Sequence, residues 1–440
     1  MQRSLMQSLL KWKEQPQRKP VLIDGVRQTG KTFLLQELLG KTFKNVIRID
    51  FLESPAYKSA FDGSLTPNDI INNIELISNR SFNLKTDLLI LDEIGECERA
   101  LTSLKYFAEK EPTAYVAASG SNIGLLNTFP VGKVEQYKLR PLSFQEFIHA
   151  SNEKSLITAY DAQTQSTAVH EQLMDRLTDY LFTGGMPEAV QTWYDNKDTG
   201  LIERIAKVNK IHKNLIEGYQ RDFGKYAGKV DAQLIEAVFS SIPSQLSLLI
   251  DDSVKRFKFK GVYQRKTRYS DFETAIHWLI RCRLSLPNYP IEGTPKAPLA
   301  AYRKENKVKL FLFDVGLLNY MLRTNYQSIK DQKQEYKGYI AENFVQQELA
   351  AQGIEPSYSW NDARAEIEFL LTDDVENIIP LEVKSGRRTR AKSLASYKQK
   401  CAPKLTVKLT ATQGSEMTEK TDLVVPLYYT HYLTKIINAH

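Results

Sequence analysis

The chemistry most clearly encoded in the sequence is the binding of a polyphosphate near its N-terminus. Residues 25–32 read Gly-Val-Arg-Gln-Thr-Gly-Lys-Thr and match the pattern GxxxxGK[ST] between a strand-like segment and a helical one. The glycines let the loop curl, so that backbone N–H groups and the helix N-terminus face a phosphate. We therefore expect ATP or a closely related nucleotide to be bound here. The expected binding residues are Gly25, Val26, Arg27, Gln28, Thr29, Gly30, Lys31 and Thr32.

Two side chains of this segment are expected to act on the nucleotide. Lys31 should reach the β- and γ-phosphates and assist catalysis, and the hydroxyl of Thr32 should ligate Mg²⁺. The structural alternative is an incidental glycine-rich turn.

An acidic pair supplies the second half of the predicted site. The apolar run 88–91 ends in Asp92 and Glu93, downstream of Lys31 in the order that such sites require. Asp92 would hold Mg²⁺ through water, and Glu93 would polarise the attacking water. Two adjacent acids at a strand end are otherwise exposed turn residues.

A polar cluster, residues 119–122, ends the next strand-like segment. Ser121 in it is a candidate to sense the γ-phosphate, with a plain strand-end turn as an equal alternative. Three cations are candidates to stabilise charge at this site or at the site of a neighbouring subunit: Arg99, Lys133 and Arg140. The sequence therefore leaves a homo-oligomer as an open alternative. Taken singly, each of these three is better explained by surface solubility.

A second candidate centre lies near the C-terminus. Glu368 and Glu382 fall on consecutive strand-like segments, and Lys384 shares a strand face with Glu382 because side chains alternate. Glu342, on the preceding helix, would be a third carboxylate. Such a group suits Mg²⁺ and the activation of water against a phosphodiester. The alternative is a structural ion pair between Glu382 and Lys384.

The pattern of apolar residues predicts the elements that position these groups. Short apolar runs alternate with amphipathic helices over residues 20–150, which indicates an α/β domain with a parallel sheet covered on both faces. Ligands of such sheets bind beyond the carboxyl ends of the strands. Residues 151–330 are mostly helical, and their strand-like segments 283–289 and 307–313 would suit a winged-helix unit. Residues 336–440 return to a mixed α/β pattern.

Composition sets the broad class. The 440 residues are 42% hydrophobic and 25% charged, which is ordinary for a folded protein of several domains. The three cysteines are scattered and the six histidines lack metal-ligand spacing, which argues against a disulfide framework and a zinc site. No run approaches the roughly 18 apolar residues of a membrane span. We expect a cytoplasmic protein without a membrane partner.

Two basic stretches hold the excess of positive charge, which is +7 overall. Residues 253–268 contain seven basic and no acidic residues, and residues 384–408 contain nine and none. Both are candidate contacts to the phosphates of DNA, with solvated faces as the alternative. In the first stretch Phe257, Phe259 and Tyr263 alternate with the charges; they would stack on bases, or simply form the buried face of a strand.

Taken together, these motifs resemble a large prokaryotic family of AAA-type ATPases that carry a conserved C-terminal domain of unknown function. The resemblance spans nearly the whole chain, and each segment alone is only modestly specific. It rests on residues 21–32, 89–96, 119–121, 139–147, 184–190, 219–227, 241–246, 312–318, 337–349, 366–369 and 380–386. Asp314, in segment 312–318, is explained equally well by helix capping and by function.

The resemblance implies three parts. These are an AAA-type P-loop ATPase domain (1–150), a helical, winged-helix-like domain (151–330) and a domain similar to PD-(D/E)XK nucleases (331–440). Two residues depart from the pattern. Lys133 stands where the family more often has arginine, and lysine lacks the planar bidentate fork. Glu368 stands where nuclease-like sequences usually have aspartate, and its extra methylene shifts the oxygens that an octahedral metal requires.

The sequence therefore predicts a Mg²⁺-dependent ATPase that acts on DNA, or is switched by it, through a nuclease-like domain. The alternative is a nucleotide-dependent signalling or assembly switch. In that case the C-terminal domain is a catalytically dead scaffold for a protein partner.

Overall fold

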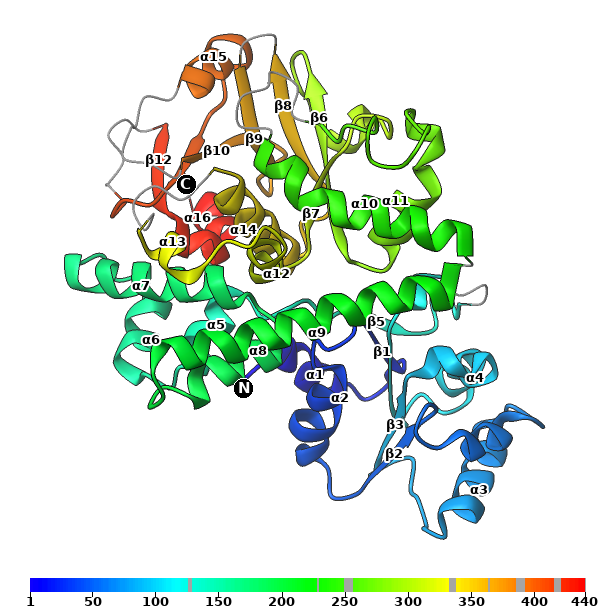
Figure 1. Ribbon diagram of the computed structural model, residues 1–440. Helices are drawn as coiled ribbons and strands as arrows, with labels where there is room; N and C mark the ends of the chain where they lie inside the picture. The colour runs from blue at the N-terminus through cyan, green and yellow to red at the C-terminus, as the bar shows by residue number, and fades with distance from the viewer. Residues whose placement is uncertain are drawn as a thin grey trace. The chain divides into compact units, whose positions relative to one another are not determined.

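The computed structural model divides into two compact units, residues Gln2–Arg140 and residues Pro141–His440 together with Met1. Each unit is built around its own β-sheet (Figure 1). The residues that the structure describes are 1–125, 129–227, 229–248, 256–331, 338–362, 365–384, 392–414 and 421–439.

The first unit contains a five-stranded sheet with the order β2-β3-β4-β1-β5, and every neighbouring pair is parallel. All five carboxyl ends therefore meet at one edge, which confirms the parallel α/β sheet predicted from the sequence. The strands are β1 (Val21–Asp24), β2 (Val46–Asp50), β3 (Leu88–Asp92), β4 (Tyr115–Gly120) and β5 (Glu135–Lys138).

Helices cover both faces of this sheet. Along β3, Leu89 and Leu91 enter one hydrophobic cluster, whereas Leu88 and Ile90 enter the other, because side chains alternate along a strand. The near-continuous apolar run of β3 is thus buried on both sides. The helical elements are α1 (Leu5–Glu14), α2 (Lys31–Phe33), which continues as η1 (Leu34–Leu39) and η2 (Gly40–Thr42), η3 (Pro55–Phe61), α3 (Pro67–Ser78), η4 (Ile94–Glu96), α4 (Glu98–Lys110) and η5 (Ile123–Leu125).

The second unit contains a mixed seven-stranded sheet with the order β12-β11-β10-β9-β8-β6-β7. Its strands are β6 (Ser285–Glu292), β7 (Lys309–Leu312), β8 (Ser357–Asp362), β9 (Ala365–Thr372), β10 (Ile378–Lys384), β11 (Thr406–Thr410) and β12 (Asp422–Pro426). β6 pairs with β7 in an antiparallel hairpin and with β8 in parallel. The hairpin expected for a winged-helix unit is therefore part of the C-terminal sheet, and a separate winged helix is not confirmed.

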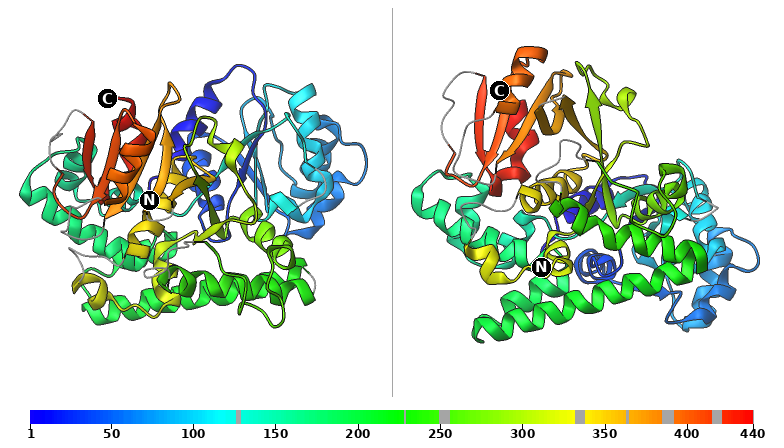
Figure 2. Two further views of the ribbon diagram at one scale, coloured as in Figure 1. Left: turned by 90° about the horizontal axis from the view of Figure 1, so that it is seen from above. Right: turned by 45° about the horizontal axis from the view of Figure 1, so that its top comes forward.

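Helices of the second unit pack against this sheet (Figure 2). α14 packs against β6, β7 and β10, and α15 packs against β9 and β10. The helices are α5 (Phe144–Ala150), α6 (Lys154–Asp161), α7 (Thr167–Thr183), α8 (Pro187–Asp195), α9 (Leu201–Ala227), α10 (Lys229–Leu248), η6 (Tyr269–Asp271), α11 (Glu273–Arg281), η7 (Leu299–Tyr302), α12 (Val315–Met321), α13 (Tyr326–Asp331), α14 (Gly338–Ala351), α15 (Lys392–Cys401), η8 (Leu427–Tyr432) and α16 (Leu433–Asn438).

α14 is a buried polar helix that ties distant segments together. Asn343 accepts a hydrogen bond from the Leu312 amide at 2.9 Å and donates one to the Leu312 carbonyl at 3.0 Å. The carboxylate of Glu348 accepts one from the Phe144 amide at 2.8 Å. Because buried polar groups need partners, these side chains fix the positions of the segments that they bind.

A tight contact joins residues 184–190 to residues 312–318. Asp314 caps α12 by accepting from the Leu317 amide at 3.0 Å, and it also accepts from the Gly185 amide at 2.7 Å. Gly184 has φ of +66°, and a Cβ there would lie 2.0 Å from an Asp314 carboxylate oxygen. Helix capping therefore accounts for Asp314. Within the described residues, no helix has both the length and the apolar character needed to cross a membrane.

Candidate functional site

The loop that follows β1 has the backbone of a phosphate cradle. A Cβ on Gly25 would lie 2.3 Å from the carbonyl oxygen of Leu139, so only glycine fits there. Gly30 has φ of +87°, and Gln28 also adopts a positive φ of 67°. Glycine adopts such angles without a steric penalty, and the chain then enters the helix at Lys31. The sequence pattern thus forms a curled loop before a helix, as predicted.

Lys31 is buried at the centre of this loop, with 5% of its surface exposed. Its ammonium donates to the carbonyls of Gly25 and Val26, each at 3.0 Å, and to the Ser121 hydroxyl at 2.8 Å. Burial lowers the pKa of Lys31, and the carboxylate of Glu93 is the strongest of the charges that oppose this shift. The loop therefore holds a desolvated cation, which suits an anionic ligand.

Asp92 gathers donors from neighbouring strands. The Thr32 hydroxyl donates to its Oδ2 atom at 2.8 Å, and the backbone amide of Glu93 donates to Oδ1 at 3.2 Å. The Ser119 hydroxyl also donates to Oδ1. Thr32 follows β1 and Asp92 ends β3, and β4 lies between those strands. The end of β4 accordingly contacts both motifs, through Ser119 and Ser121.

Glu93 occupies the turn from β3 into η4. It is half-buried and has φ of 48°, a left-handed conformation that is uncommon outside glycine. Such angles recur where a chain turns sharply at a functional site. The predicted acid thus lies directly beside Asp92 and close enough to influence Lys31.

Two arginines that sequence reasoning missed also contact this site. Arg3 is buried and donates to the carbonyls of Thr29 at 2.8 Å and Arg140 at 2.7 Å. Arg48, on β2, donates from Nε to Asp92 Oδ2 at 3.0 Å. No pattern signals Arg3, because the contact joins positions far apart in the chain. Arg48 lies two residues before the end of β2, and only the pairing of β2 with β3 brings it to Asp92.

Two of the other cations considered from the sequence, Arg99 and Lys133, have local partners. Arg99 donates to the carbonyls of Phe61 and Gly63. Lys133 forms an ion pair with Glu109 at 2.9 Å. These contacts hold loops of the same unit together.

The site has features that suit a polyphosphate and a hard cation. Its loop admits no side chain at Gly25, its lysine is a buried cation, and a hydroxyl and a carboxylate oxygen lie side by side. Hard cations such as Mg²⁺ prefer oxygen donors of this kind. The parallel sheet and this arrangement define the class of protein, a P-loop nucleoside-triphosphatase.

The comparisons with known proteins agree with that class. Residues 17–148 match a family described as an AAA domain, which supports an ATP-binding ATPase. Residues 174–328 and 337–430 match two families described as domains of unknown function, DUF8612 and DUF4143. The expected C-terminal domain of unknown function is thus present, whereas its likeness to nucleases is not confirmed.

One curated protein and two solved structures are also similar to this chain, at lower similarity, and they add less to the assignment. An uncharacterized protein of Haemophilus influenzae is 24% identical over 250 residues, which are 53% of this chain and 53% of that protein. PCH-2 of C. elegans is 12% identical, with a TM-score of 0.24 over 43% of this chain and 58% of that one. Drosophila ORC bound to DNA is 11% identical, with a TM-score of 0.29 over 72% and 94%. At such scores neither structural likeness carries an argument.

The structure does not bring the predicted C-terminal carboxylates together as a metal site. Glu342 pairs with Lys309, and Glu368 accepts from the Val383 amide at 3.1 Å. Lys384 Nζ lies 2.9 Å from Glu382 Oε1, a charge contact that falls short of hydrogen-bond geometry. Across the described part of the chain, no three His, Cys, Asp or Glu side chains cluster closely enough to hold a metal.

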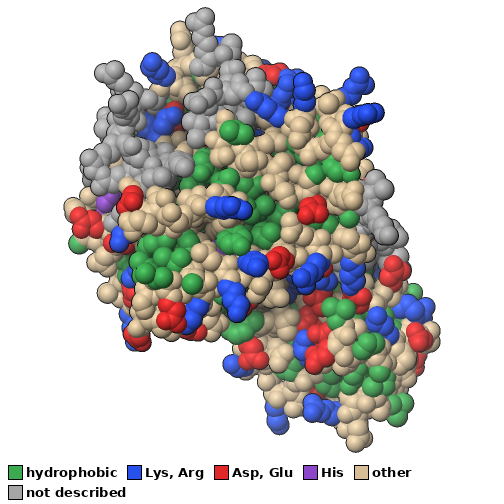
Figure 3. All heavy atoms as spheres, in the orientation of Figure 1, with side chains coloured by type: hydrophobic (Ala, Val, Ile, Leu, Met, Phe, Trp, Pro, Cys, Tyr) green, Lys and Arg blue, Asp and Glu red, His purple; other side chains and the backbone are tan. Residues whose placement is uncertain are grey.

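The two basic stretches differ in how their charges are used. In residues 256–268, Phe257 is buried and Phe259 stacks on Phe272, so the alternation separates a packed face from a solvated one. The basic side chains there remain mostly exposed, and Figure 3 shows Lys and Arg side chains around β6 and near α11. In residues 392–408, Lys398 and Lys400 pair with Asp422 and Asp362. Residues 253–255 and 385–391, with Arg387, Arg388 and Arg390, lie outside the described residues.

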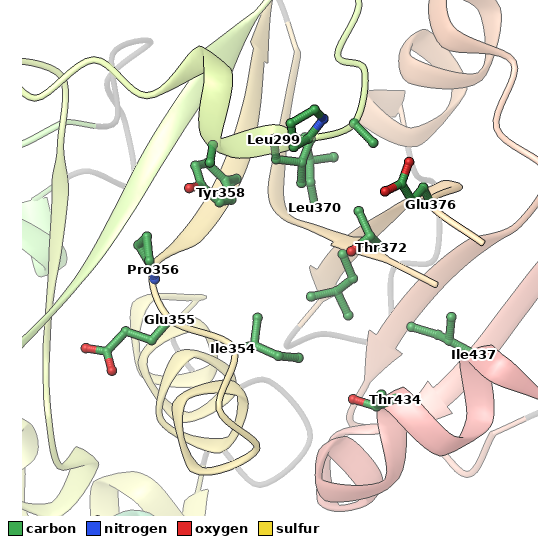
Figure 4. Close-up of a pocket in the computed structure, with 14 residues that line it drawn as sticks. Leu299, Ile354, Glu355, Pro356, Tyr358, Leu370, Thr372, Glu376, Thr434 and Ile437 are labelled. Atoms are coloured by element: carbon green, nitrogen blue, oxygen red, sulfur yellow. The ribbon is translucent and has the colours of Figure 1, made fainter. Parts of the chain in front are cut away.

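A pocket of about 400 Å³ lies elsewhere in the second unit (Figure 4). Apolar side chains such as Leu299, Ile354 and Leu370 line much of it, with Thr372 and Thr434 among the polar ones. Its size suits a small ligand. None of the site residues predicted from the sequence lies among its described lining residues, so this pocket is separate from both predicted centres.

Proposed function

We propose that the chain is a Mg²⁺-dependent ATPase that acts on DNA, or is switched by it, through a nuclease-like C-terminal domain. The observation that carries the ATPase is the convergence of Lys31, Thr32 and Asp92 at one edge of a parallel sheet. The three-part division at 1–150, 151–330 and 331–440 belongs to the same proposal.

Each residue of the site has a role in this proposal. The backbone of residues 25–30 and the ammonium of Lys31 bind the phosphates, and Ser121 orients that ammonium. Thr32 and Asp92 hold Mg²⁺, which neutralises charge on the phosphates and so eases transfer to water. Glu93 accepts a proton from the attacking water or orients it.

Hydrolysis is the direct test of the ATPase. Wild-type protein should release phosphate from ATP in the presence of Mg²⁺, and Lys31→Ala should reduce the rate at least a hundredfold, because it removes the buried cation from the loop. Lys41→Ala removes an exposed charge of the same unit and should leave the rate unchanged. An equal rate in wild type and Lys31→Ala would contradict the assignment.

Support for DNA as the partner comes from the exposed charges of residues 256–268. Arg256, Lys260 and Arg265 are exposed, and such side chains bind phosphates in a salt-dependent way. Replacing all three by alanine should weaken the binding of a 30-base-pair duplex about tenfold or more and reduce its salt dependence. The matched control replaces Lys11, Lys41 and Lys44, which are exposed in the first unit.

A parallel variant neutralises the three arginines at residues 387, 388 and 390, and its DNA binding is measured in the same assay. If neutralising these arginines weakens binding and the first variant does not, the contact to DNA lies in the 384–408 stretch. If neither variant changes the affinity, the basic stretches are solvated faces and the DNA proposal fails.

A specific observation favours the second candidate, a nucleotide-dependent switch with an inactive nuclease-like scaffold. Glu342 and Glu382 each face a lysine, and Glu368 is engaged by a backbone amide. The lysines beside Glu342 and Glu382 supply positive charge that a metal would otherwise supply. Divalent metal bound between Glu368 and Glu382 in a crystal soaked with Mn²⁺ would decide for the nuclease. The Glu382–Lys384 pair persisting there would decide for the scaffold.

A further inference from the structure

Arg48 places a guanidinium on the carboxylate that is expected to hold the metal. It lies on β2, next to β3, in a register that pairs Asp50 with Asp92. Its Nε and one terminal nitrogen each lie 3.0 Å from Asp92 Oδ2. Asp92 is buried, with 1% of its side chain exposed, so this ion pair is poorly screened by solvent.

The donors around Asp92 leave no vacant position for a cation. Oδ2 accepts hydrogen bonds from the Thr32 hydroxyl and from Arg48 Nε, and Oδ1 accepts them from the Ser119 hydroxyl and the amide of Glu93. An ionised carboxylate offers about four lone-pair positions. A divalent cation, or its bound water, must therefore displace a donor. Arg48 is the charged one, so its departure relieves the repulsion between two cations.

A second set of acids is ready to receive Arg48. One of its terminal nitrogens already donates to Asp50 Oδ2, and the other lies 3.5 Å from Glu53. The other oxygen of Asp50 accepts from the amides of Leu52 and Glu53, at 2.9 and 3.0 Å, so that this carboxylate is fixed in place. The guanidinium needs only to give up Asp92 and keep these contacts.

We propose that Arg48 is a positioning residue that competes with the divalent metal for Asp92 and thereby sets the metal requirement of nucleotide binding. Without metal, Arg48 holds Asp92 in its place. When metal binds, Arg48 moves onto Asp50 and Glu53, which links occupancy of the site to the turn at residues 50–53. This inference rests on the proposed nucleotide site.

The test measures how nucleotide binding depends on Mg²⁺ in the full-length chain. The probe is a fluorescent ADP, mant-ADP. It is titrated into the protein at a series of fixed free Mg²⁺ concentrations, from excess chelator up to about 10 mM. Its readout is the free Mg²⁺ concentration at which the gain in mant-ADP affinity is half-complete. Arg48→Gln should lower this midpoint about tenfold, because the competing charge is gone. Affinity in chelator should stay within about twofold of wild type.

Asp50→Asn should shift the midpoint in the opposite direction. The amide oxygen can still accept from the turn amides, whereas the loss of charge leaves Arg48 with Asp92 as its main partner. Lys41→Gln, an exposed cation of the same unit, is the matched control and should leave the midpoint unchanged. If circular dichroism shows that Arg48→Gln is unfolded, Asp50→Asn carries the test alone.

The outcomes separate this inference from the proposed function. An unchanged or higher midpoint in Arg48→Gln overturns the competition, and so does an unchanged or lower midpoint in folded Asp50→Asn. A large loss of mant-ADP affinity in chelator also overturns it, since Arg48 would then contact the nucleotide. If wild type binds no mant-ADP at any Mg²⁺ concentration, the nucleotide site itself fails, and this inference with it.

Discussion

The two units each bring acids close to a lysine, yet they use these groups differently. In residues Gln2–Arg140, groups from β1, β3 and β4 converge, and Lys31 is held by carbonyls and a hydroxyl. In residues Pro141–His440, Glu382 is neutralised by Lys384 on its own strand, and Glu342 is neutralised by Lys309.

The difference shows which feature makes a lysine available to a ligand. Lys31 has no carboxylate among its hydrogen-bond partners described above, so its charge is left for a phosphate. Lys384 and Lys309 already compensate a buried acid, and breaking such a pair leaves an uncompensated charge. Residue types alone do not distinguish a binding site from a structural ion pair; the partners do.

The largest expected effect concerns the acid of the first unit. Glu93→Gln keeps the shape of the side chain but removes the base, so ATP should still bind while hydrolysis falls about a hundredfold or more. Single-turnover phosphate release and ATP calorimetry together check this. A variant that hydrolyses ATP at the wild-type rate would show that Glu93 is not the residue that acts on water.

A smaller effect is expected from the paired lysine of the second unit. Lys384→Met leaves Glu382 buried without its partner and should lower the free energy of unfolding by about 1–3 kcal/mol. This loss is smaller than the loss expected for a fully buried ion pair, because Lys384 is partly exposed. Urea denaturation measures it. Glu382→Gln combined with Lys384→Met should recover part of the loss; additive losses would mean that the two side chains do not compensate each other.

The third effect is a pH dependence of the free energy of unfolding, which comes from Glu348 of α14. Burial raises the pKa of Glu348 to about 8. Between the ordinary carboxyl pKa and that value, the folded chain keeps a proton that the unfolded chain has released. The contribution of Glu348 to the free energy of unfolding therefore falls as the pH rises through this interval, by at most about 1.4 kcal/mol per pH unit.

Glu348→Gln resembles the protonated acid and can still accept from the Phe144 amide. Urea denaturation from pH 5 to pH 8 should show the variant gaining stability over wild type as pH rises. Parallel curves for the two proteins would show that Glu348 titrates normally. In that case Glu348 would no longer count among the structural acids of the second unit.

Much of the first unit could be predicted from the sequence. The parallel sheet followed from apolar runs that alternate with helices, and the convergence of Lys31, Thr32 and Asp92 followed from the common edge at which parallel strands end. Arg3 and Arg48 could not be predicted, because their contacts depend on strand order and on the path of the N-terminal segment.

The second unit was less predictable for a physical reason. The hairpin of β6 and β7 has the local pattern of an independent wing, and only its pairing with β8 reveals the larger sheet. Likewise Glu368 and Glu382 were correctly expected on neighbouring strands. Their engagement by Val383 and Lys384 depends on side-chain geometry that spacing does not specify.

Calorimetric titration of ATP with Mg²⁺ into the 440-residue chain tests directly whether the loop at residues 25–32 binds a nucleotide. We predict saturable binding of one ATP per chain, with affinity reduced about a hundredfold or more in Lys31→Ala and unchanged in Lys41→Ala. The absence of measurable binding to wild type, or equal binding to wild type and Lys31→Ala, would contradict it.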